Sequence, residues 1–363
     1  MKSFSPKMLG QFFIFGFDGN FPTDDFLHLI EKQNLGGVIL FDRNIESPKQ
    51  ISERIKELKS RSKHPLFIMI DQEGGRINRI TEDFPVFPSN KFYGDRKDKD
   101  GIFKAYKTSA RELAGLGINV NLAPVVDVLI NPDNSVLKER SFGKDPHLVA
   151  EMSKKAIEAI KSENILACGK HFPGIGNIDV DPHSDLPINP NSKERFEKID
   201  FLPFKASISA NVDMIMSTHV LCPNLDSEEP ASLSKAICTG ILRKELGFEG
   251  ILITDDMQMG AIRKNRKLTE ACQKAFLAGN DLILICDKFE EQVQVLEYFE
   301  KQVSDKKISE ERLNFSLGKI LTTKKKLKGY PLPLSPLQGE SLQDEPLSIS
   351  WRGGRSKMHR HRG

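Results

Sequence analysis

Two apolar runs, Gly37-Val38-Ile39-Leu40-Phe41 and Leu282-Ile283-Leu284-Ile285, carry no polar side chain at either alternating position. Strands buried on both faces have this pattern, which is typical of parallel sheets covered by helices. Further short runs of this kind recur along the chain. Together they predict eight strands: Gln11–Phe15, Gly37–Phe41, Leu66–Ile70, Asn119–Leu122, Ile165–Gly169, Met214–Ser217, Gly250–Ile253 and Leu282–Cys286.

Amphipathic stretches separate these runs, and their spacing predicts helices. They are Ser47–Ser62, Asp100–Leu116, Pro146–Glu163, Lys193–Ala210, Ser232–Leu246, Leu268–Ala278 and, after the last strand, Ser309–Lys328. Eight strand-then-helix units favour a closed α/β fold, a single (β/α)8 TIM barrel, over an open doubly wound sheet. We therefore expect one barrel domain over residues 1–330. Residues 331–363 contain four prolines and a Gly-, Arg- and His-rich end, which predicts a disordered C-terminal tail.

Composition excludes several classes of protein. The net charge of +3 argues against a dedicated nucleic-acid binder, and a hydrophobic fraction of 39 % is enough for a sizeable core. The sequence has no apolar run of membrane-spanning length and no segment typical of a secretory signal, so we expect no membrane partner. Five cysteines without CxxC spacing indicate reduced thiols in a cytoplasmic protein rather than a structural zinc site.

Polar side chains follow the predicted strands where the strands end. They form the clusters Asp71-Gln72-Glu73-Gly74-Gly75-Arg76, Ala123-Pro124-Val125-Val126-Asp127, Lys170-His171-Phe172-Pro173-Gly174, Thr218-His219 and Thr254-Asp255-Asp256. Active sites of βα barrels lie at the carboxyl ends of the strands, so these clusters should meet at one mouth. Taken singly, each residue also fits an ordinary cap or turn, and Asp127 fits this reading best.

The mouth lacks the motifs of other enzyme classes. Neither a G-x-S-x-G elbow nor a phosphate-binding P-loop is present. His171, His183 and Asp181 are conceivable zinc ligands, but no HExxH-type spacing supports such a site. Carboxylates and cations together suit a neutral polyhydroxylated substrate, because charged groups form directional hydrogen bonds to hydroxyls and a carboxylate can attack an anomeric carbon.

Several ordered motifs resemble glycoside hydrolase family 3, in particular its single-domain bacterial β-N-acetylhexosaminidases. They are Gly37-Val38-Ile39-Leu40-Phe41 with Arg43-Asn44, Asp71-Gln72-Glu73-Gly74-Gly75-Arg76-Ile77-Asn78-Arg79, Arg140-Ser141-Phe142-Gly143, Lys170-His171-Phe172-Pro173-Gly174 with Asp181-Pro182-His183-Ser184-Asp185-Leu186-Pro187, and Ile253-Thr254-Asp255-Asp256-Met257-Gln258-Met259. The resemblance runs from about residue 8 to residue 328.

The resemblance implies a retaining exo-enzyme that removes terminal, non-reducing β-linked N-acetylglucosamine without a cofactor or metal. It implies a carbohydrate substrate such as a muropeptide of cell-wall recycling or a chitooligosaccharide, and we expect a monomer. Asp255 would be the nucleophile and the Asp181–His183 pair the general acid/base. The sugar would be held by Asp71, Arg79, Arg140, Lys170, His171 and His219.

The chemistry of these residue types agrees with the implied roles. Retention requires a covalent intermediate, which a carboxylate at a strand end can form. Asp255 directly follows the seventh predicted strand, whereas Asp256 should point elsewhere. An imidazole titrates near neutrality and suits an acid/base role when an aspartate fixes its tautomer. Pro173, Gly174 and Gly176 suit a mobile loop around His183.

Three positions depart from the family pattern, of which Met257, in place of leucine, conserves side-chain volume. Ile175 stands where the family has a second histidine, which removes a polar contact near the base of the loop. Pro182 stands between Asp181 and His183 in place of the usual serine, and proline restricts both its own φ and the residue before it.

Two other functions remain open from the sequence. Some family members transfer the glycosyl group to phosphate, and a histidine repels phosphate less than a carboxylate does. A non-catalytic barrel that binds amino sugars or muropeptides is the third reading. The presence of Asp255, Asp181 and His183 together disfavours a pure binding module.

Overall fold

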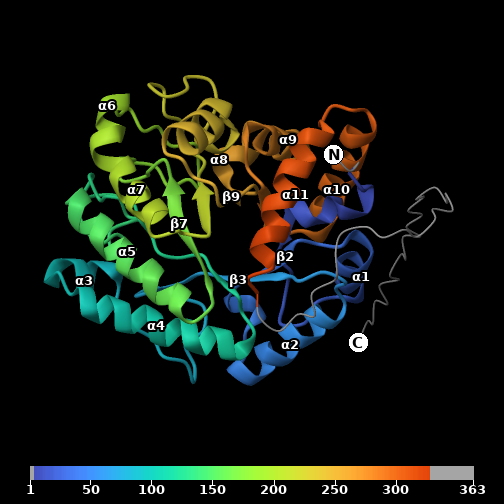
Figure 1. Cartoon of the computed structure of the whole chain (residues 1–363), viewed down its shortest axis with the longest axis horizontal. Helices are drawn as coiled ribbons and strands as arrows, with labels where there is room; N and C mark the ends of the chain where they lie inside the picture. The colour runs from blue at the N-terminus through green and yellow to red at the C-terminus, as the bar shows by residue number, and fades with distance from the viewer. Residues whose placement is uncertain (1–3, 328–363) are drawn as a thin grey trace, which may run out of the picture. The chain divides into compact units, whose positions relative to one another are not determined.

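The computed structural model describes residues 4–327 (Figure 1). The predicted tail, residues 331–363, lies outside the described residues. Eight parallel strands form a closed barrel in chain order: β1 (Phe13–Phe15), β2 (Gly37–Leu40), β3 (Phe67–Ile70), β6 (Val120–Asn121), β7 (Leu166–Phe172), β8 (Met214–Ser217), β9 (Ile251–Asp256) and β10 (Leu282–Ile285). The predicted (β/α)8 barrel is therefore confirmed.

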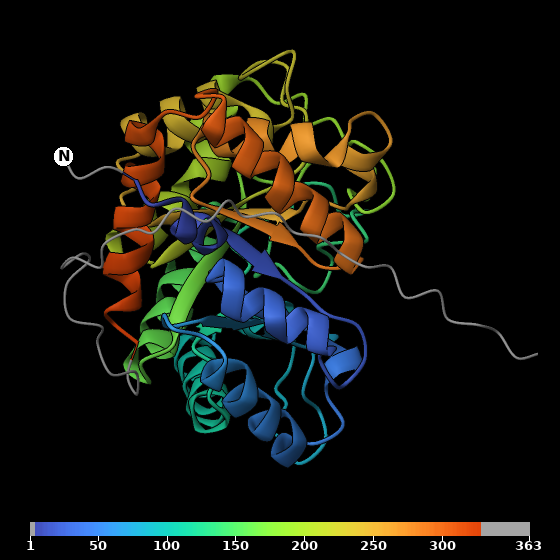
Figure 2. The same cartoon turned by 90° about the vertical axis from the view of Figure 1, so that its right-hand side faces the viewer.

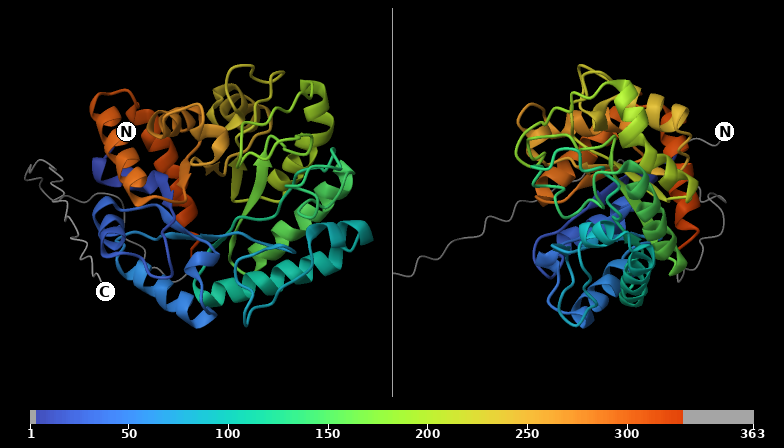
Figure 3. Two further views of the ribbon diagram at one scale, coloured as in Figure 1. Left: turned by 180° about the vertical axis from the view of Figure 1, so that it is seen from behind. Right: turned by 90° about the vertical axis from the view of Figure 1, so that its left-hand side faces the viewer.

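Helices surround the barrel on its outside, as the views from two further sides show (Figure 3). They are α1 (Asp24–Gln33), α2 (Pro48–Ser60), α3 (Asn90–Arg96), α4 (Lys99–Leu116), α5 (Pro146–Ser162), α6 (Lys193–Arg195), α7 (Phe201–Ser209), α8 (Gly260–Arg263), α9 (Leu268–Ala278), α10 (Phe289–Ser304) and α11 (Glu310–Lys324). Short 3-10 turns are η1 (Pro6–Phe12), η2 (Asp42–Asn44) and η4 (Ala231–Leu233), and π-helical turns are η3 (Phe196–Asp200) and η5 (Ala236–Glu245).

Barrel closure explains why the strand runs are apolar throughout. One face of each strand packs inside the barrel and the other packs beneath the helices, so every residue of β2, β3, β8 and β10 is buried. Several helices begin with a side-chain cap. The Ser47 hydroxyl accepts a hydrogen bond from the Gln50 N–H at 3.2 Å, and the Asp98 carboxylate accepts one from the Gly101 N–H at 2.8 Å.

Two sequence predictions are wrong in detail. Gln11 and Phe12 belong to η1 rather than to the first strand, because the Gln11 amide donates to the Asn34 carbonyl at 2.6 Å and accepts from Lys324 Nζ at 2.7 Å. These contacts hold η1 beside α11 (Figure 2). The predicted helix Lys193–Ala210 contains the π-turn η3, because Pro203 has no N–H to complete an α-helical hydrogen bond to Ile199.

A small hairpin, β4 (Gln72–Gly74) and β5 (Ile77–Asn78), continues the chain beyond β3 at the carboxyl end of the barrel. The sequence predicted this segment only as a polar cluster. The Gln72 amide oxygen accepts hydrogen bonds from the Arg79 and Ile80 N–H groups at 2.8 and 3.3 Å, which fixes the hairpin. Within residues 4–327, no helix is long and apolar enough to cross a membrane.

Candidate active site

A buried ion network forms the floor of the mouth. Lys170, on β7, lies 2.6 Å from both Asp71 Oδ1 and Glu73 Oε1 through its Nζ atom. Lys170 and Glu73 are almost fully buried, with 2 % and 1 % of their surface exposed. Burial lowers the pKa of Lys170, but Asp71 and Glu73 more than offset this effect, so the pKa is raised and the amine stays charged.

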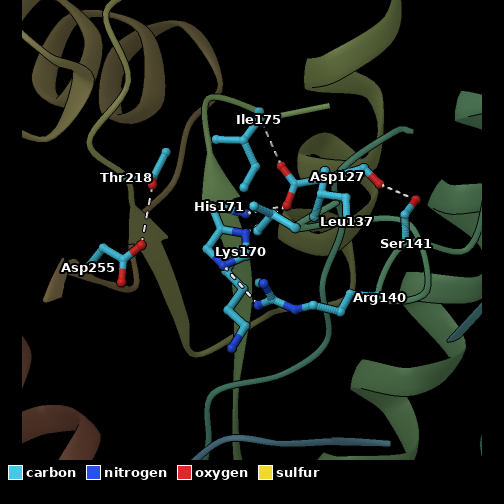
Figure 4. A network of polar contacts seen from close by, with 12 residues as sticks. Asp127, Leu137, Arg140, Ser141, Lys170, His171, Ile175, Thr218 and Asp255 are labelled. Atoms are coloured by element: carbon cyan, nitrogen blue, oxygen red, sulfur yellow. Dashed lines mark hydrogen bonds and ion pairs between the residues drawn. The ribbon is translucent and has the colours of Figure 1, made fainter. Parts of the chain in front are cut away.

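Arg140 joins this network from the loop after β6. Its guanidinium donates to both Glu73 carboxylate oxygens at 2.8 Å and lies 3.3 Å from His171 Nε2 (Figure 4). Burial opposes the charge on Glu73, yet Arg140 and Lys170 outweigh it and hold the Glu73 pKa well below its usual range. The pKa of Arg140 is raised because Glu73 outweighs the effect of burial. These charges are therefore fixed and mutually compensated.

His171 is oriented from behind by Asp127. The Asp127 Oδ2 atom lies 2.7 Å from His171 Nδ1 and also accepts the His171 backbone N–H at 3.1 Å. The other Asp127 oxygen accepts the Ile175 N–H at 2.9 Å (Figure 4). This carboxylate fixes the ring and directs Nε2 toward Arg140. Ile175, which replaces the family's second histidine, is buried in the hydrophobic core.

Sequence reasoning missed Glu73 and Asp127 as site residues. Glu73 lies within the quoted Asp71-to-Arg79 motif, so its position was visible but its role was not. The sequence left open that Asp127 is an ordinary cap or turn residue. In the structure it is 1 % exposed, accepts the His171 and Ile175 N–H groups and contacts the His171 ring. The sequence signal that could have identified Asp127 is a carboxylate directly after an apolar run.

Asp255 lies at the end of β9 on another side of the same mouth. Thr218 Oγ1 donates to its Oδ2 at 3.3 Å (Figure 4), and the Asp256 N–H donates to its Oδ1 at 2.9 Å. Burial raises the pKa of Asp255, but His171, His219 and the Asp256 N–H outweigh burial and lower it. Asp255 is thus held as a carboxylate with both oxygens oriented, which is the form a nucleophile requires.

Asp256 has a different environment from its neighbour. Its Oδ1 accepts the Gln258 and Cys286 N–H groups at 3.1 and 3.2 Å, and burial raises its pKa to about 6. His219 is fully buried between Ser232 and the Asp256 carbonyl, at 2.7 and 3.0 Å from its two ring nitrogens. Both nitrogens of His219 therefore already have protein partners, beside the strand end that positions Asp255.

Arg79 lies at the rim of the floor network. Its guanidinium is 3.6 Å from Asp71 Oδ2 and 3.3 Å from Asp42 Oδ1, and it lies over the ring of Phe41 at 5.4 Å. Asp71 thus connects the buried Lys170 with the more accessible Arg79. The structure brings Asp71, Arg79, Arg140, Lys170 and His171 into one connected set, as the sequence predicted for a sugar site.

Asp181 and His183 lie on the loop after β7, apart from the floor network. Asp181 Oδ1 is 2.7 Å from His183 Nδ1 and accepts the His183 N–H at 2.9 Å, so the predicted pair is formed. The imidazole is 68 % exposed, and burial raises the pKa of Asp181 less than the His183 contacts lower it. His171 and His183 belong to separate pairs, and the part of the chain described here contains no group of three side chains suited to a metal ion.

Comparisons with known proteins agree with this geometry. Residues 10–323 match the Glycosyl hydrolase family 3 N terminal domain. A β-hexosaminidase A from Pseudoalteromonas piscicida is 35 % identical over 326 residues, which cover 82 % of this chain and 54 % of that relative. A β-hexosaminidase from Nitrosomonas eutropha is 36 % identical over 259 residues, covering 70 % of this chain and 74 % of the relative.

A solved structure gives the same result. The glycoside hydrolase family 3 β-N-acetylglucosaminidase from Paenibacillus sp. str. FPU-7 superposes with a TM-score of 0.88 at 35 % identity, over 92 % of this chain and 65 % of that chain. The present chain thus spans about half of the Pseudoalteromonas relative and two thirds of the Paenibacillus protein. The sequence match, the barrel and the motif residues at its mouth lead to one conclusion: the chain belongs to glycosyl hydrolase family 3.

Proposed function

We propose that this protein is a retaining β-N-acetylglucosaminidase that hydrolyses terminal, non-reducing β-linked N-acetylglucosamine. The observation that carries the proposal is the placement of the Asp255 carboxylate at the mouth of the barrel, where Thr218 and the Asp256 N–H orient its two oxygens. An oriented carboxylate can attack the anomeric carbon and form a covalent glycosyl-enzyme. The names of the two curated relatives and of the Paenibacillus structure agree with this substrate class.

The floor network supports the binding of a sugar rather than of an ion. Its carboxylates and cations compensate each other, so the floor offers hydrogen-bond donors and acceptors without a large net charge. We assign Asp71, Arg79, Arg140, Lys170 and His171 to binding the sugar hydroxyls. We assign His219 an indirect part in the sugar site, because both of its ring nitrogens have protein partners and it lies beside the strand end that positions Asp255.

We assign the general acid/base role to His183, with Asp181 as the group that fixes its tautomer. In the first step His183 protonates the leaving glycosidic oxygen while the C1–O bond breaks and Asp255 bonds to C1. In the second step His183 removes a proton from water, and the water displaces Asp255. The exposed imidazole can exchange its proton with solvent between the two steps.

The proposal also includes the compartment, the oligomeric state and the natural substrate of the protein. All five cysteines are buried free thiols, which agrees with a reducing compartment such as the cytoplasm. We propose a monomer that acts on N-acetylglucosaminyl muropeptides released during cell-wall turnover.

The deciding experiment follows N-acetylglucosamine release from a β-N-acetylglucosaminide, with and without inorganic phosphate. Proton NMR of the first product should show the β-anomer, which identifies retention. Phosphate-dependent formation of a sugar 1-phosphate would instead identify a phosphorylase, and binding of the disaccharide without turnover would identify a binding module.

A further inference from the structure

The base of the loop that carries Asp181 and His183 is held by asparagine side chains. Asn134 donates to the Ile175 carbonyl at 2.7 Å, Asn131 to the Ile178 carbonyl at 3.2 Å, and Asn189 to the Gly174 carbonyl at 3.1 Å. On the returning side, the Asn189 and Leu221 N–H groups donate to the Leu221 and Pro187 carbonyls at 2.8 and 2.9 Å. Residues 180–186, which contain the acid/base pair, lie between these two anchored ends of the loop.

This part of the loop contacts the segment that follows the nucleophile strand. The Gly260 N–H donates to the His183 carbonyl and the Ala261 N–H donates to the Pro182 carbonyl, both at 3.1 Å. Lys264 Nζ lies 2.9 Å from Asp185 Oδ2. Gly260 follows Asp255 by only five residues in the chain, so these contacts link the acid/base loop to the nucleophile strand.

Glycine at position 260 leaves room for the close approach of the loop, and its own backbone conformation does not require glycine. Its φ is not among the positive values at which glycine is favoured, so alanine is compatible with the backbone here. A Cβ at this position would lie 2.5 Å from the Ser184 carbonyl oxygen and 2.6 Å from that of His183. Any side chain at residue 260 would therefore push the loop away by contact with the two peptide units that follow His183.

We infer that Gly260 and Lys264 are positioning residues that hold the Asp181–His183 loop against the segment after β9 and so set His183 relative to Asp255. This inference rests on the proposed function, because it assigns these residues to the acid/base step. Gly260 supplies close approach and a backbone donor, and Lys264 supplies an ion pair that orients the segment around Asp185.

The first test replaces Gly260 with alanine. Gly115→Ala is the matched control, because an added Cβ at this exposed α4 position meets no atom within 4 Å. Hydrogen–deuterium exchange should show faster exchange of the Gly260 and Ala261 amides in the Gly260→Ala variant alone. Turnover of unactivated N,N′-diacetylchitobiose should fall by about 10–100-fold, as expected for a misplaced catalytic group. The rate of Asp255 glycosylation by a nitrophenyl glycoside should fall less.

The second test replaces Lys264 with alanine, with Lys267→Ala as control, because Lys267 is an exposed lysine of the same segment that pairs with Glu270 at 3.6 Å. We expect about a two- to fivefold loss on chitobiose for Lys264→Ala, since exposed ion pairs contribute little. Asp185→Lys combined with Lys264→Asp should restore the rate.

The outcomes separate the two claims. Unchanged amide exchange in Gly260→Ala, or changed exchange with an equal loss on activated and unactivated glycosides, would overturn the positioning role. If the unaltered protein released no sugar from either glycoside, the proposed function would fail and the positioning role with it. Amide exchange would still report whether the loop contacts Gly260.

Discussion

The floor of the mouth and the loop above it hold charged side chains in opposite ways. In the floor, Glu73 and Lys170 are at most 2 % exposed and each charge has several partners. On the loop, the His183 side chain is 68 % exposed and the Asp181 side chain 42 % exposed. The difference separates two requirements: a sugar site needs groups fixed before binding, whereas an acid/base must deliver and accept protons at different steps.

Asp255, the proposed nucleophile, belongs to the fixed region, and its loss should give the largest effect. Asp255→Asn keeps the shape of the side chain and removes the attacking charge, so turnover should fall by several orders of magnitude. Thermal unfolding should be little changed. A 2-fluoro or 5-fluoro glycosyl inactivator followed by peptide mass spectrometry should label Asp255 in the unaltered enzyme. Labelling of Asp256, Asp71 or Glu73 would show that the nucleophile is misassigned.

The opposite charges in the floor should stabilise the folded protein because each neutralises its partners. Glu73→Leu removes both hydrogen bonds of Arg140 and one partner of Lys170, and leaves buried positive charge without compensation. Removing one partner of a buried ion pair costs about 3–5 kcal/mol of unfolding free energy. Urea denaturation should detect this loss, whereas the exposed Asp185→Ala should leave the midpoint unchanged. A loss below about 1 kcal/mol for Glu73→Leu would contradict the contrast between the two regions.

The loop should show the reverse behaviour, with a loss of activity and no loss of stability. His183→Ala should lower turnover of chitobiose by about 10²–10⁴-fold, the range of general acid–base catalysis. Glycosylation by a nitrophenyl glycoside should fall less, because that leaving group needs little protonation. Azide should restore the second step, since it attacks without a base. Equal losses on both substrates without azide rescue would assign the proton transfer to another group.

Asp200, the last residue of η3, is a buried carboxyl outside the floor network and lacks the cation partners that Glu73 has. Burial, and then the charge of Asp127, raise its pKa to about 7, and its Oδ1 has no hydrogen-bond partner among the described residues. The folded protein therefore binds a proton that the unfolded chain releases near pH 4, so this group costs stability as pH rises from about 4 to 7. Asp200→Asn should unfold at higher urea than the unaltered protein at pH 8, with a smaller difference at pH 4.5. A difference that does not change with pH would refute this assignment.

Among Asp255, His183 and Asp181, replacing Asp181 should give the smallest effect on turnover, and it compares the two members of the loop pair. Asp181→Asn keeps the shape of the side chain but removes the carboxylate that fixes the tautomer of His183. Turnover of chitobiose should fall by about tenfold, less than in His183→Ala, with the same preference for activated glycosides. A loss as large as that of His183→Ala would give Asp181 a direct part in proton transfer.

The sequence alone predicted the barrel and which motif residues meet at its mouth. Runs that are apolar on both faces predicted all eight strands, because a parallel strand that is buried on both sides has apolar residues at successive positions. Met214–Ser217 is predicted to the residue, while β9 continues to Asp256, beyond the predicted end at Ile253. The motif residues Asp71, Arg140, Lys170 and His171 lie together at the mouth because the carboxyl ends of parallel strands meet there.

Only the tertiary structure decided which side chains are partners. Asp127, in the loop after β6, contacts His171 on β7, and Glu73 lies between Lys170 and Arg140. These contacts depend on strand register and barrel closure, which leave no local pattern in the sequence. Pro203 shows the same limit, because its missing N–H gave a π-turn inside a pattern that predicted an unbroken helix. The contact between Gly260 and the His183 loop joins segments about 77 residues apart, and its physical basis is close backbone approach, which leaves no periodic signal in a sequence.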